Sequence, residues 1–350
     1  GKTTLKELLG NSLKKISKVT ISPKSFNNKY GVPLSLFNLS QNDNFGVLEV
    51  GMDKKGEIDY LSKIIQPDVS VITNINYAHA KNFKNIKDIA LAKSEIIDNT
   101  KSNGSVVLNA DDDFFELHKA KALNQKLKVI SFGIKNKKSD IKFIKIKKSK
   151  KFYEIIVKQN NSRISFFTQN EFRNNIYNIL SALSVMSLFI DISSLKKNIF
   201  LDFKIPDGRG NISILNIDKK KIRLIDESYN SNPLSLKSAL FNYDKINSKK
   251  AKKFLLLGDM LELGNHSRKL HNSIVPIINK TNIDKVYVKG KNVSGIFNKI
   301  SKSKKGKILN NKSQIIELIK KDLNNNDYLM IKASNATGFN KIIKEIKRLN

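Results

Sequence analysis

The sequence predicts an α/β protein with a P-loop-type mononucleotide-binding domain followed by a smaller, Rossmann-like α/β domain. Short apolar runs alternate with helical stretches along both halves of the 350-residue chain, a pattern typical of parallel sheets covered by helices. The chain opens on Gly1-Lys2-Thr3-Thr4, directly ahead of a helical pattern. A turn-rich segment at 204–210 separates the halves, so we expect domains at 1–204 and 205–350.

The first half is predicted to form a parallel sheet with an antiparallel extension. Three strand-like runs within 141–168, separated by lysine-rich turns, predict that extension. We expect helices at 4–16, 86–99 and 172–190, and strands at 45–51, 69–75, 106–108 and 129–132.

The same alternation restarts after the turn-rich segment. Apolar runs predict strands at 222–226, 254–257, 285–288 and 328–332. Helical patterns separate them near 233–245, 267–279, 312–323 and 338–348.

Composition narrows the class of protein. Cysteine is absent, which excludes a disulfide framework and thiolate metal sites and is consistent with a cytoplasmic protein. No apolar stretch approaches the roughly 20 residues of a membrane helix, so we expect no membrane insertion.

The formal net charge of +33 has two interpretations. Lysine and arginine neutralise phosphates, so one is nucleic-acid binding. We favour the other, a composition rich in Lys, Asn and Ile on solvated faces, because lysines occur in nearly every segment without interleaved aromatic residues that stack bases. We therefore expect non-specific attraction to polyanions and no specific nucleic-acid partner.

The first four residues match the second half of the phosphate-binding motif G-x-x-x-x-G-K-[ST]. In that motif backbone N–H groups hold phosphate oxygens, the lysine reaches the β- and γ-phosphates, and the hydroxyl binds Mg²⁺. An ordinary helix start can give the same tetrapeptide, but the helix and the α/β alternation that follow favour a phosphate loop. Because the chain begins inside this loop, we expect an N-terminally clipped fragment.

Two polar side chains are predicted at the carboxyl edge of the first sheet. Glu49 lies at the end of the strand at 45–51, and His79 lies four residues past the strand that ends at Ile75. Ligands gather at this edge of parallel sheets, so a carboxylate and an imidazole there can hold a metal ion beside the phosphates. Singly, each is a common loop residue; with the phosphate loop, the metal site is the better interpretation.

The second half also places polar turns after strands. Asp226 and Glu227 end one strand and are followed by Ser228-Tyr229-Asn230, and Gly258-Asp259 follows another. Such residues equally serve as turns and helix caps. From the residues alone the prediction is a two-domain enzyme that binds Mg²⁺ and a nucleotide.

Read together, these segments resemble the Mur ligases, and in particular the UDP-N-acetylmuramoyl-tripeptide–D-alanyl-D-alanine ligase family. The resemblance runs along nearly the whole chain. Its motifs are Ser25-Phe26-Asn27-Asn28, Gly31-Val32-Pro33-Leu34, Glu49-Val50-Gly51-Met52, Gly56-Glu57-Ile58, Thr73-Asn74-Ile75, Ala78-His79, Ala92-Lys93, Glu95-Ile96, Asn175, Asn178, Gly208-Arg209, Ser228-Tyr229-Asn230, Asn232-Pro233 and Asp259 to Gly264.

The resemblance implies an ATP-dependent, ADP-forming amide ligase of peptidoglycan precursor synthesis. ATP would phosphorylate the terminal carboxylate of UDP-MurNAc-tripeptide, and the amine of D-Ala-D-Ala would attack the acyl phosphate. It further implies a monomeric cytoplasmic enzyme with a central domain at 1–204 and a C-terminal domain at 205–350. The family's N-terminal domain for the UDP end of the substrate would be absent, so we expect this fragment alone to be inactive.

The resemblance also implies roles for individual residues. ATP-binding residues would be Gly1, Lys2, Thr3, Thr4, Asn175, Asn178 and Arg209. Metal ligands would be Thr3, Glu49, His79 and Lys93, the last as a carbamoylated lysine, which nothing else in the sequence singles out. Asn27, Asn28, Tyr229 and Asn230 would bind substrate, and Lys93, Lys2 and Glu227 would be catalytic.

The sequence departs from the family pattern at four positions. Asn174 stands where many members have histidine, and Glu227 where aspartate is usual. Asn76 and Ala333 occupy positions that are usually glycine.

Alternatives of three kinds stay open at this point. Another Mur ligase or a folylpolyglutamate-type ligase is the nearest. A basic nucleic-acid-binding P-loop protein is a different class, and an inactive fragment is the third.

Overall fold

The computed structural model describes residues 1–77, 80–248 and 251–348 and divides the chain into two compact units, Gly1–Lys204 and Ile205–Asn350. The division falls at the turn-rich segment, where Gly208 and Gly210 adopt positive φ angles of 74° and 98°. Glycine reaches this conformation without steric cost, so the pair forms a tight turn ahead of the second sheet.

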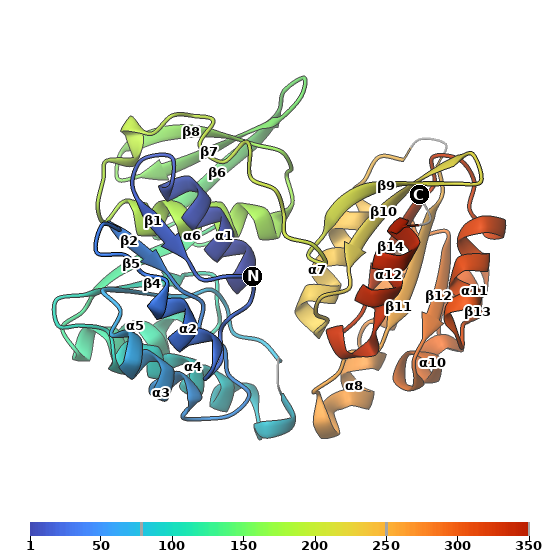
Figure 1. Ribbon diagram of the computed structural model, residues 1–350, viewed down its shortest axis with the longest axis horizontal. Helices are drawn as coiled ribbons and strands as arrows, with labels where there is room; N and C mark the ends of the chain where they lie inside the picture. The colour runs from blue at the N-terminus through green and yellow to red at the C-terminus, as the bar shows by residue number, and fades with distance from the viewer. Residues whose placement is uncertain (78–79, 249–250, 349–350) are drawn as a thin grey trace. The chain divides into compact units, whose positions relative to one another are not determined.

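The first unit contains a six-stranded sheet with the order β3-β4-β5-β6-β7-β8 (Figure 1). Strands β3 to β6 are parallel, and β6, β7 and β8 are antiparallel, which confirms the antiparallel extension predicted from the three strand-like runs within 141–168. A separate parallel pair joins β1 and β2. The strands are β1 Val19–Ile21, β2 Phe45–Val47, β3 Val69–Ile72, β4 Ser105–Asn109, β5 Lys128–Gly133, β6 Ile141–Lys148, β7 Tyr153–Gln159 and β8 Ser162–Thr168.

Helices cover both faces of this sheet. One apolar cluster joins the sheet to α1 and α6, and a second joins its other face to α3, α4 and α5. The helices are α1 Lys2–Leu13, α2 Gly31–Phe37, α3 Glu57–Ile65, α4 Ile86–Asp98, α5 Phe115–Asn124 and α6 Arg173–Met186.

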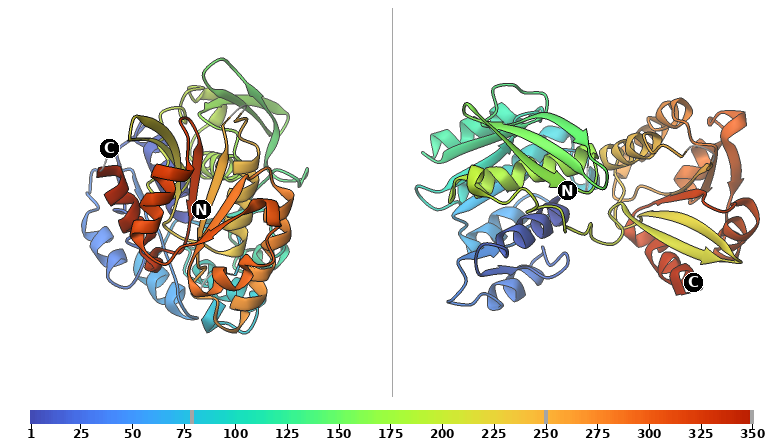
Figure 2. Two further views of the ribbon diagram at one scale, coloured as in Figure 1. Left: turned by 90° about the vertical axis from the view of Figure 1, so that its right-hand side faces the viewer. Right: turned by 90° about the horizontal axis from the view of Figure 1, so that it is seen from above.

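The second unit, coloured yellow to red in Figure 2, contains a six-stranded sheet. Its strand order is β13-β12-β11-β14-β10-β9. Its strands are parallel except β9, which pairs antiparallel with β10 at the edge. One apolar cluster packs the sheet against α11 and α12, and another packs it against α7, α9 and α10. The elements are β9 Asn211–Ile217, β10 Lys220–Glu227, α7 Pro233–Asp244, β11 Lys253–Gly258, α8 Ser267–Asn272, α9 Val275–Lys280, β12 Lys285–Lys289, α10 Lys291–Phe297, β13 Lys305–Ile308, α11 Lys312–Glu317, β14 Tyr328–Lys332 and α12 Phe339–Arg348.

Both units are α/β, as predicted, but some element ends differ. The single helix expected at 267–279 is two helices, because Pro276 has no N–H to continue the i to i−4 ladder through 273–274. The strands expected to reach Gly51 and Ile75 end at Val47 and Ile72. The polar residues beyond them lie in loops, with Gly51 N–H bonded to Asn27 O and Ile75 N–H bonded to Asp112 Oδ2.

No helix in the described ranges is long and apolar enough to cross a membrane.

Candidate active site

The predicted phosphate-loop residues form the start of α1. Gly1 caps the helix, and its carbonyl accepts the first helical hydrogen bond from Leu5 N–H at 2.8 Å. Leu5, Leu8, Leu9 and Leu13 anchor the helix in the core. The N–H groups and the dipole at the start of a helix favour the binding of anions.

Thr3 and Glu49 are brought into direct contact by α1 and the loop after β2. Thr3 is 4% exposed and its hydroxyl donates to Glu49 Oε2 at 2.6 Å. Asn27 Nδ2 donates to Glu49 Oε1 at 2.8 Å, and Ser25 Oγ lies 3.3 Å from Thr3 Oγ1. Thr3 and Asn27, predicted to bind metal and substrate respectively, therefore both contact the carboxylate of the predicted metal ligand Glu49.

Glu49 is a buried carboxylate that has neutral partners. It is 5% exposed, and its side chain bonds to a hydroxyl and an amide but to no cationic group of the described chain. A charged group is costly to bury without a counter-charge or a full set of hydrogen bonds. The donor set is therefore suited to a cation bound beside Thr3 and Glu49, with Asn27 holding the carboxylate in place.

Lys6 was not predicted and connects α1 to the segment that carries Ser25 and Asn27. It is 3% exposed, and its ammonium donates to the carbonyl oxygens of Ser22 and, at 2.6 Å, Lys24. It also pairs with Glu7 at 2.8 Å. Lys6 lies one helical turn after Lys2, so the spacing places both lysines on the same face of the helix. In a chain with 64 basic residues, this spacing was not enough to distinguish Lys6 from the surface lysines.

Lys93 has the electrostatics expected of a reactive amine. It projects from α4 and donates to Asn74 O at 2.9 Å. Burial, and then repulsion by Lys2, lower its pKa from 10.5 to about 7, against the attraction of Asp112. The structure thus brings Lys93 close enough to Lys2 for their charges to interact, and leaves a large share of the Lys93 amine neutral at physiological pH.

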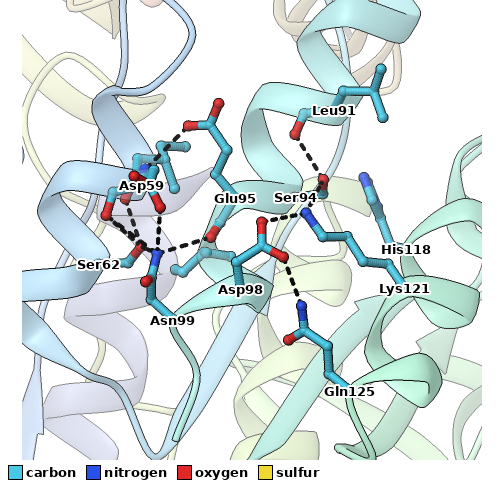
Figure 3. Close-up of polar contacts among 12 residues, drawn as sticks. Asp59, Ser62, Leu91, Ser94, Glu95, Asp98, Asn99, His118, Lys121 and Gln125 are labelled. Atoms are coloured by element: carbon cyan, nitrogen blue, oxygen red, sulfur yellow. Dashed lines mark hydrogen bonds and ion pairs between the residues drawn. The ribbon is translucent and has the colours of Figure 1, made fainter.

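Polar contacts on both sides fix α4 and therefore Lys93 (Figure 3). Toward α3, the Asn99 amide donates to Asp59 Oδ1 at 3.0 Å and to Ser62 Oγ at 2.9 Å. Toward α5, Lys121 donates to Ser94 Oγ at 3.1 Å and pairs with Asp98 at 2.6 Å.

Glu95, two residues after Lys93, caps the start of α3. Its carboxylate accepts hydrogen bonds from Gly56 N–H at 2.9 Å and Asp59 N–H at 3.1 Å. Because Gly56 closes the loop that follows Glu49, Glu95 connects that loop to the helix of Lys93.

The two asparagines predicted for ATP differ in their surroundings. Asn178 is 7% exposed, its side chain has no hydrogen-bond partner in the described chain, and its Oδ1 lies 3.3 Å from where a Cβ on Gly1 would stand. Asn175 donates instead to Thr168 Oγ1 at 2.8 Å. The side-chain amide of Asn178 therefore lies beside the predicted phosphate loop and can bind a ligand there, whereas the amide of Asn175 is bonded to Thr168.

The remaining first-unit predictions lie apart from this cluster or outside the described residues. Asn28 Oδ1 accepts hydrogen bonds from Tyr30 N–H and Gly31 N–H at 3.1 and 2.9 Å and so starts α2. His79 lies outside the described residues. In the described part of the chain no three His, Cys, Asp or Glu side chains gather into a metal-holding group.

In the second unit, Glu227 ends β10 opposite a buried lysine of β14. Lys332 is 1% exposed and its ammonium lies 3.2 Å from Glu227 Oε2 and 2.6 Å from Asn230 O. Lys332 was not predicted as a site residue; as a lysine inside an apolar strand, it was recognisable from the sequence. The pair fixes the carboxylate and the turn that carries Tyr229 and Asn230.

Arg209 lies over the ring of Tyr229 at 4.2 Å from its centroid. Gly208 makes this approach possible, since a Cβ there would come within 2.8 Å of Tyr229 Cβ. The predicted second-unit residues Arg209, Glu227, Tyr229 and Asn230 are therefore neighbours.

The segment from Asp259 to Gly264 has a structural role. Asp259 accepts a hydrogen bond from Val293 N–H at 2.8 Å at the start of α10. Met260 N–H donates to His271 Nε2 at 3.1 Å, and His271 Nδ1 lies 2.8 Å from Ser267 O. Because a carbonyl can only accept, His271 carries its proton on Nδ1, and burial lowers its pKa.

Comparisons with known proteins match both units. Residues 1–186 match the Mur ligase middle domain, and residues 214–335 match the glutamate ligase domain of Mur ligases.

Curated relatives and solved structures agree with these matches. The UDP-N-acetylmuramoyl-tripeptide–D-alanyl-D-alanine ligase of Buchnera aphidicola from Acyrthosiphon pisum is 33% identical over 99% of this chain and 74% of its own. That of Bacillus subtilis is 28% identical, with the same coverage of each chain. The structure of MurF from Acinetobacter baumannii aligns at TM-score 0.86 and 25% identity over 99% of this chain and 74% of its own. The structure of MurF from Thermotoga maritima in complex with ADP aligns at TM-score 0.83 and 25% identity, over 100% of this chain and 78% of its own.

Proposed function

The chain belongs to the Mur ligase family, and we propose that it joins UDP-MurNAc-tripeptide to D-Ala-D-Ala at the expense of ATP. The relatives that cover 99% of the chain carry this activity in their names. ATP, Mg²⁺ and a UDP-linked substrate are molecules of the cytoplasm, where we place a monomeric enzyme.

The observation that carries the proposal is the Thr3–Glu49 contact of 2.6 Å at the start of α1. A hydroxyl and a buried carboxylate are oxygen ligands of the kind Mg²⁺ prefers, and Mg²⁺ takes its remaining ligands from water and nucleotide phosphates. Thr3 and Glu49 would hold the ion, which supplies neutralisation of phosphoryl charge when bound.

The proposed reaction has two steps. A carboxylate oxygen of the tripeptide attacks the γ-phosphorus of ATP, and ADP leaves. The D-Ala-D-Ala amine then attacks the acyl carbon, phosphate leaves, and the amine loses a proton. The backbone at the start of α1 and the Lys2 ammonium would bind the β- and γ-phosphates and stabilise the charge that develops there.

Lys93 would act as a carbamate. Only a neutral amine attacks CO₂, forming an N–C bond and releasing one proton, so the pKa of about 7 favours this modification at physiological pH. The carbamate replaces a repelling ammonium beside Lys2 with an anionic oxygen ligand. The contacts of Ser94, Glu95, Asp98 and Asn99 with neighbouring helices hold α4 while this occurs.

The second unit would contribute groups from the Gly208–Asn230 neighbourhood. Arg209 would bind nucleotide phosphate, with its guanidinium oriented by the Tyr229 ring. Glu227 keeps the charge of the family's usual aspartate, and Lys332 fixes its longer side chain.

The test is phosphate release by the complete gene product with ATP, Mg²⁺, UDP-MurNAc-tripeptide and D-Ala-D-Ala. We expect release to require both substrates and to be abolished in Lys93→Ala, with part of the activity restored by a short carboxylic acid. Lys87→Ala, an exposed position on the same helix, is the matched control and should retain activity. Turnover of Lys93→Ala at the control rate would refute the carbamate role.

A further inference from the structure

The sheet extension β6–β8, together with the loop 135–140 that precedes it, carries an unusual share of the positive charge of the chain. Residues 135–168 contain eleven basic and two acidic side chains, a net charge of +9 within 34 of 350 residues, against +33 for the whole chain. The extension lies at one end of the first unit, where the turn between β6 and β7 reaches away from the body (Figure 1).

Strand register places much of this charge on one face. The inner face packs Ile155, Val157 and Phe166 into the core shared with α6. The other face carries a row of directly opposed cations, Lys142, Lys158 and Arg163.

Two further lysines share this outer face. In the strand register, Lys145 lies opposite Ile156 and Lys147 lies opposite Glu154. Ile156 and Glu154 are on the same side of β7 as Lys158. We call the outer face of β6–β8, with Lys142, Lys145, Lys147, Lys158 and Arg163, the basic face.

These cations lack the internal partners that lysines have elsewhere. None of the eleven basic side chains of 135–168 forms an ion pair with any residue that the structure describes, and among their hydrogen bonds only Lys142 reaches a carbonyl, that of Lys137. In the lysine-rich segment 299–307, by contrast, Lys304 and Lys305 donate to carbonyls of the second unit. Like charges opposed across strands destabilise a sheet, so anions lying over the row would relieve this repulsion.

We propose that the basic face docks on an anionic phospholipid bilayer. Charge complementarity gives the attraction, because juxtamembrane lysines bind the negative surface potential of such bilayers. Ile144, at the irregularity of register within β6, is 36% exposed among these lysines and offers an apolar group for the interface.

The same residues disfavour a polynucleotide. Ten of the eleven basic residues are lysines, so the forked guanidinium contacts typical of base recognition are nearly absent. The rings of Phe152 and Phe167 in this region contact each other in a tilted arrangement, with centroids 4.5 Å apart, and both are half-buried. They therefore offer no open platform for bases.

Vesicle flotation of the chain tests this docking. We expect binding to vesicles of equal parts phosphatidylcholine and phosphatidylglycerol, no binding to phosphatidylcholine alone, and loss of binding as salt rises. Replacing Lys142, Lys145, Lys147 and Lys158 by Gln should lower the partition coefficient about tenfold or more. The matched variant with Lys14, Lys18, Lys87 and Lys126 changed to Gln loses the same charge at exposed sites elsewhere and should bind nearly as the parent does.

Three outcomes with the lysine variants and the parent chain would overturn the proposal. They are no binding to anionic vesicles, an equal loss in the two variants, and tighter binding to poly(U) than to vesicles through the same lysines. Ile144→Ser keeps every charge, so weaker vesicle binding with unchanged poly(U) binding supports the bilayer, and an equal effect on both probes contradicts it. Circular dichroism of each variant checks that it is folded, and none of these measurements depends on ligase activity.

Discussion

The titration of Lys93 gives the most specific prediction. Its pKa of about 7, against 10.5 for an ordinary lysine, makes about half of the amine neutral at pH 7. An ordinary lysine is neutral in only about one molecule in 3,000 at that pH, since each pKa unit is a factor of ten. We therefore expect Lys93 to be the amine that reacts with CO₂ at neutral pH.

Competitive labelling with trace acetic anhydride in CO₂-free buffer, followed by peptide mass spectrometry, measures this titration. The labelling of Lys93 should have its midpoint near pH 7, and the exposed Lys87 on the same helix serves as the internal reference. Bicarbonate should then protect Lys93 selectively. A Lys93 profile that follows Lys87 would refute the reasoning.

A second perturbation tests the stated cause. Lys2 lowers the pKa of Lys93, so Lys2→Met should raise the labelling midpoint. Linkage gives an independent check. Between about pH 7 and 10.5 the unfolded chain binds more protons at Lys93 than the folded chain does, so the free energy of unfolding rises with pH across that window. Lys93→Met should remove this rise, and an unchanged slope in denaturant titrations would count against the depressed pKa.

Three further substitutions test the site and its support. Glu49→Gln should weaken Mg²⁺ binding in the presence of ATP by roughly 10- to 100-fold in a metal titration, because the anionic ligand is lost. An unchanged titration midpoint would exclude Glu49 as a Mg²⁺ ligand. Lys332→Met should lower the free energy of unfolding by roughly 3 kcal/mol in urea, because it leaves Glu227 without its buried partner. Lys320→Met, at an exposed ion pair, should lower it by less than about 1 kcal/mol. Equal losses of stability in the two variants would contradict this prediction. Asn99→Ala should cost about 1–3 kcal/mol in the same experiment, because its amide joins α3 to α4, and a neutral effect would show that those bonds are dispensable.

Much of the fold was predictable because it rests on local periodicity. The β–α alternation predicted both sheets, and three strand-like runs separated by lysine-rich turns predicted the antiparallel strands β6–β8. Several shorter elements, such as β1 and α2, escaped prediction. At three and seven residues they carry too little periodic pattern to be distinguished from loops.

Several residues of the candidate site could be named from the sequence, but their contacts could not. The carboxyl-edge rule placed Glu49 beside the phosphate loop, and the structure brings Glu49 to Thr3 across 46 positions of sequence. The depressed pKa of Lys93 arises from burial and from Lys2 on another helix, which no local pattern encodes. Asn175 was predicted for ATP from its motif, and its bond to Thr168 depends on a strand and a helix meeting.

Phosphate release that depends on the dipeptide tests the proposed activity most directly. With ATP, Mg²⁺ and UDP-MurNAc-tripeptide, the complete gene product should release phosphate when D-Ala-D-Ala is added and remain near background with glutamate or diaminopimelate in its place. Release stimulated by either single amino acid, and not by the dipeptide, would contradict the assignment and point to another amino-acid-adding ligase.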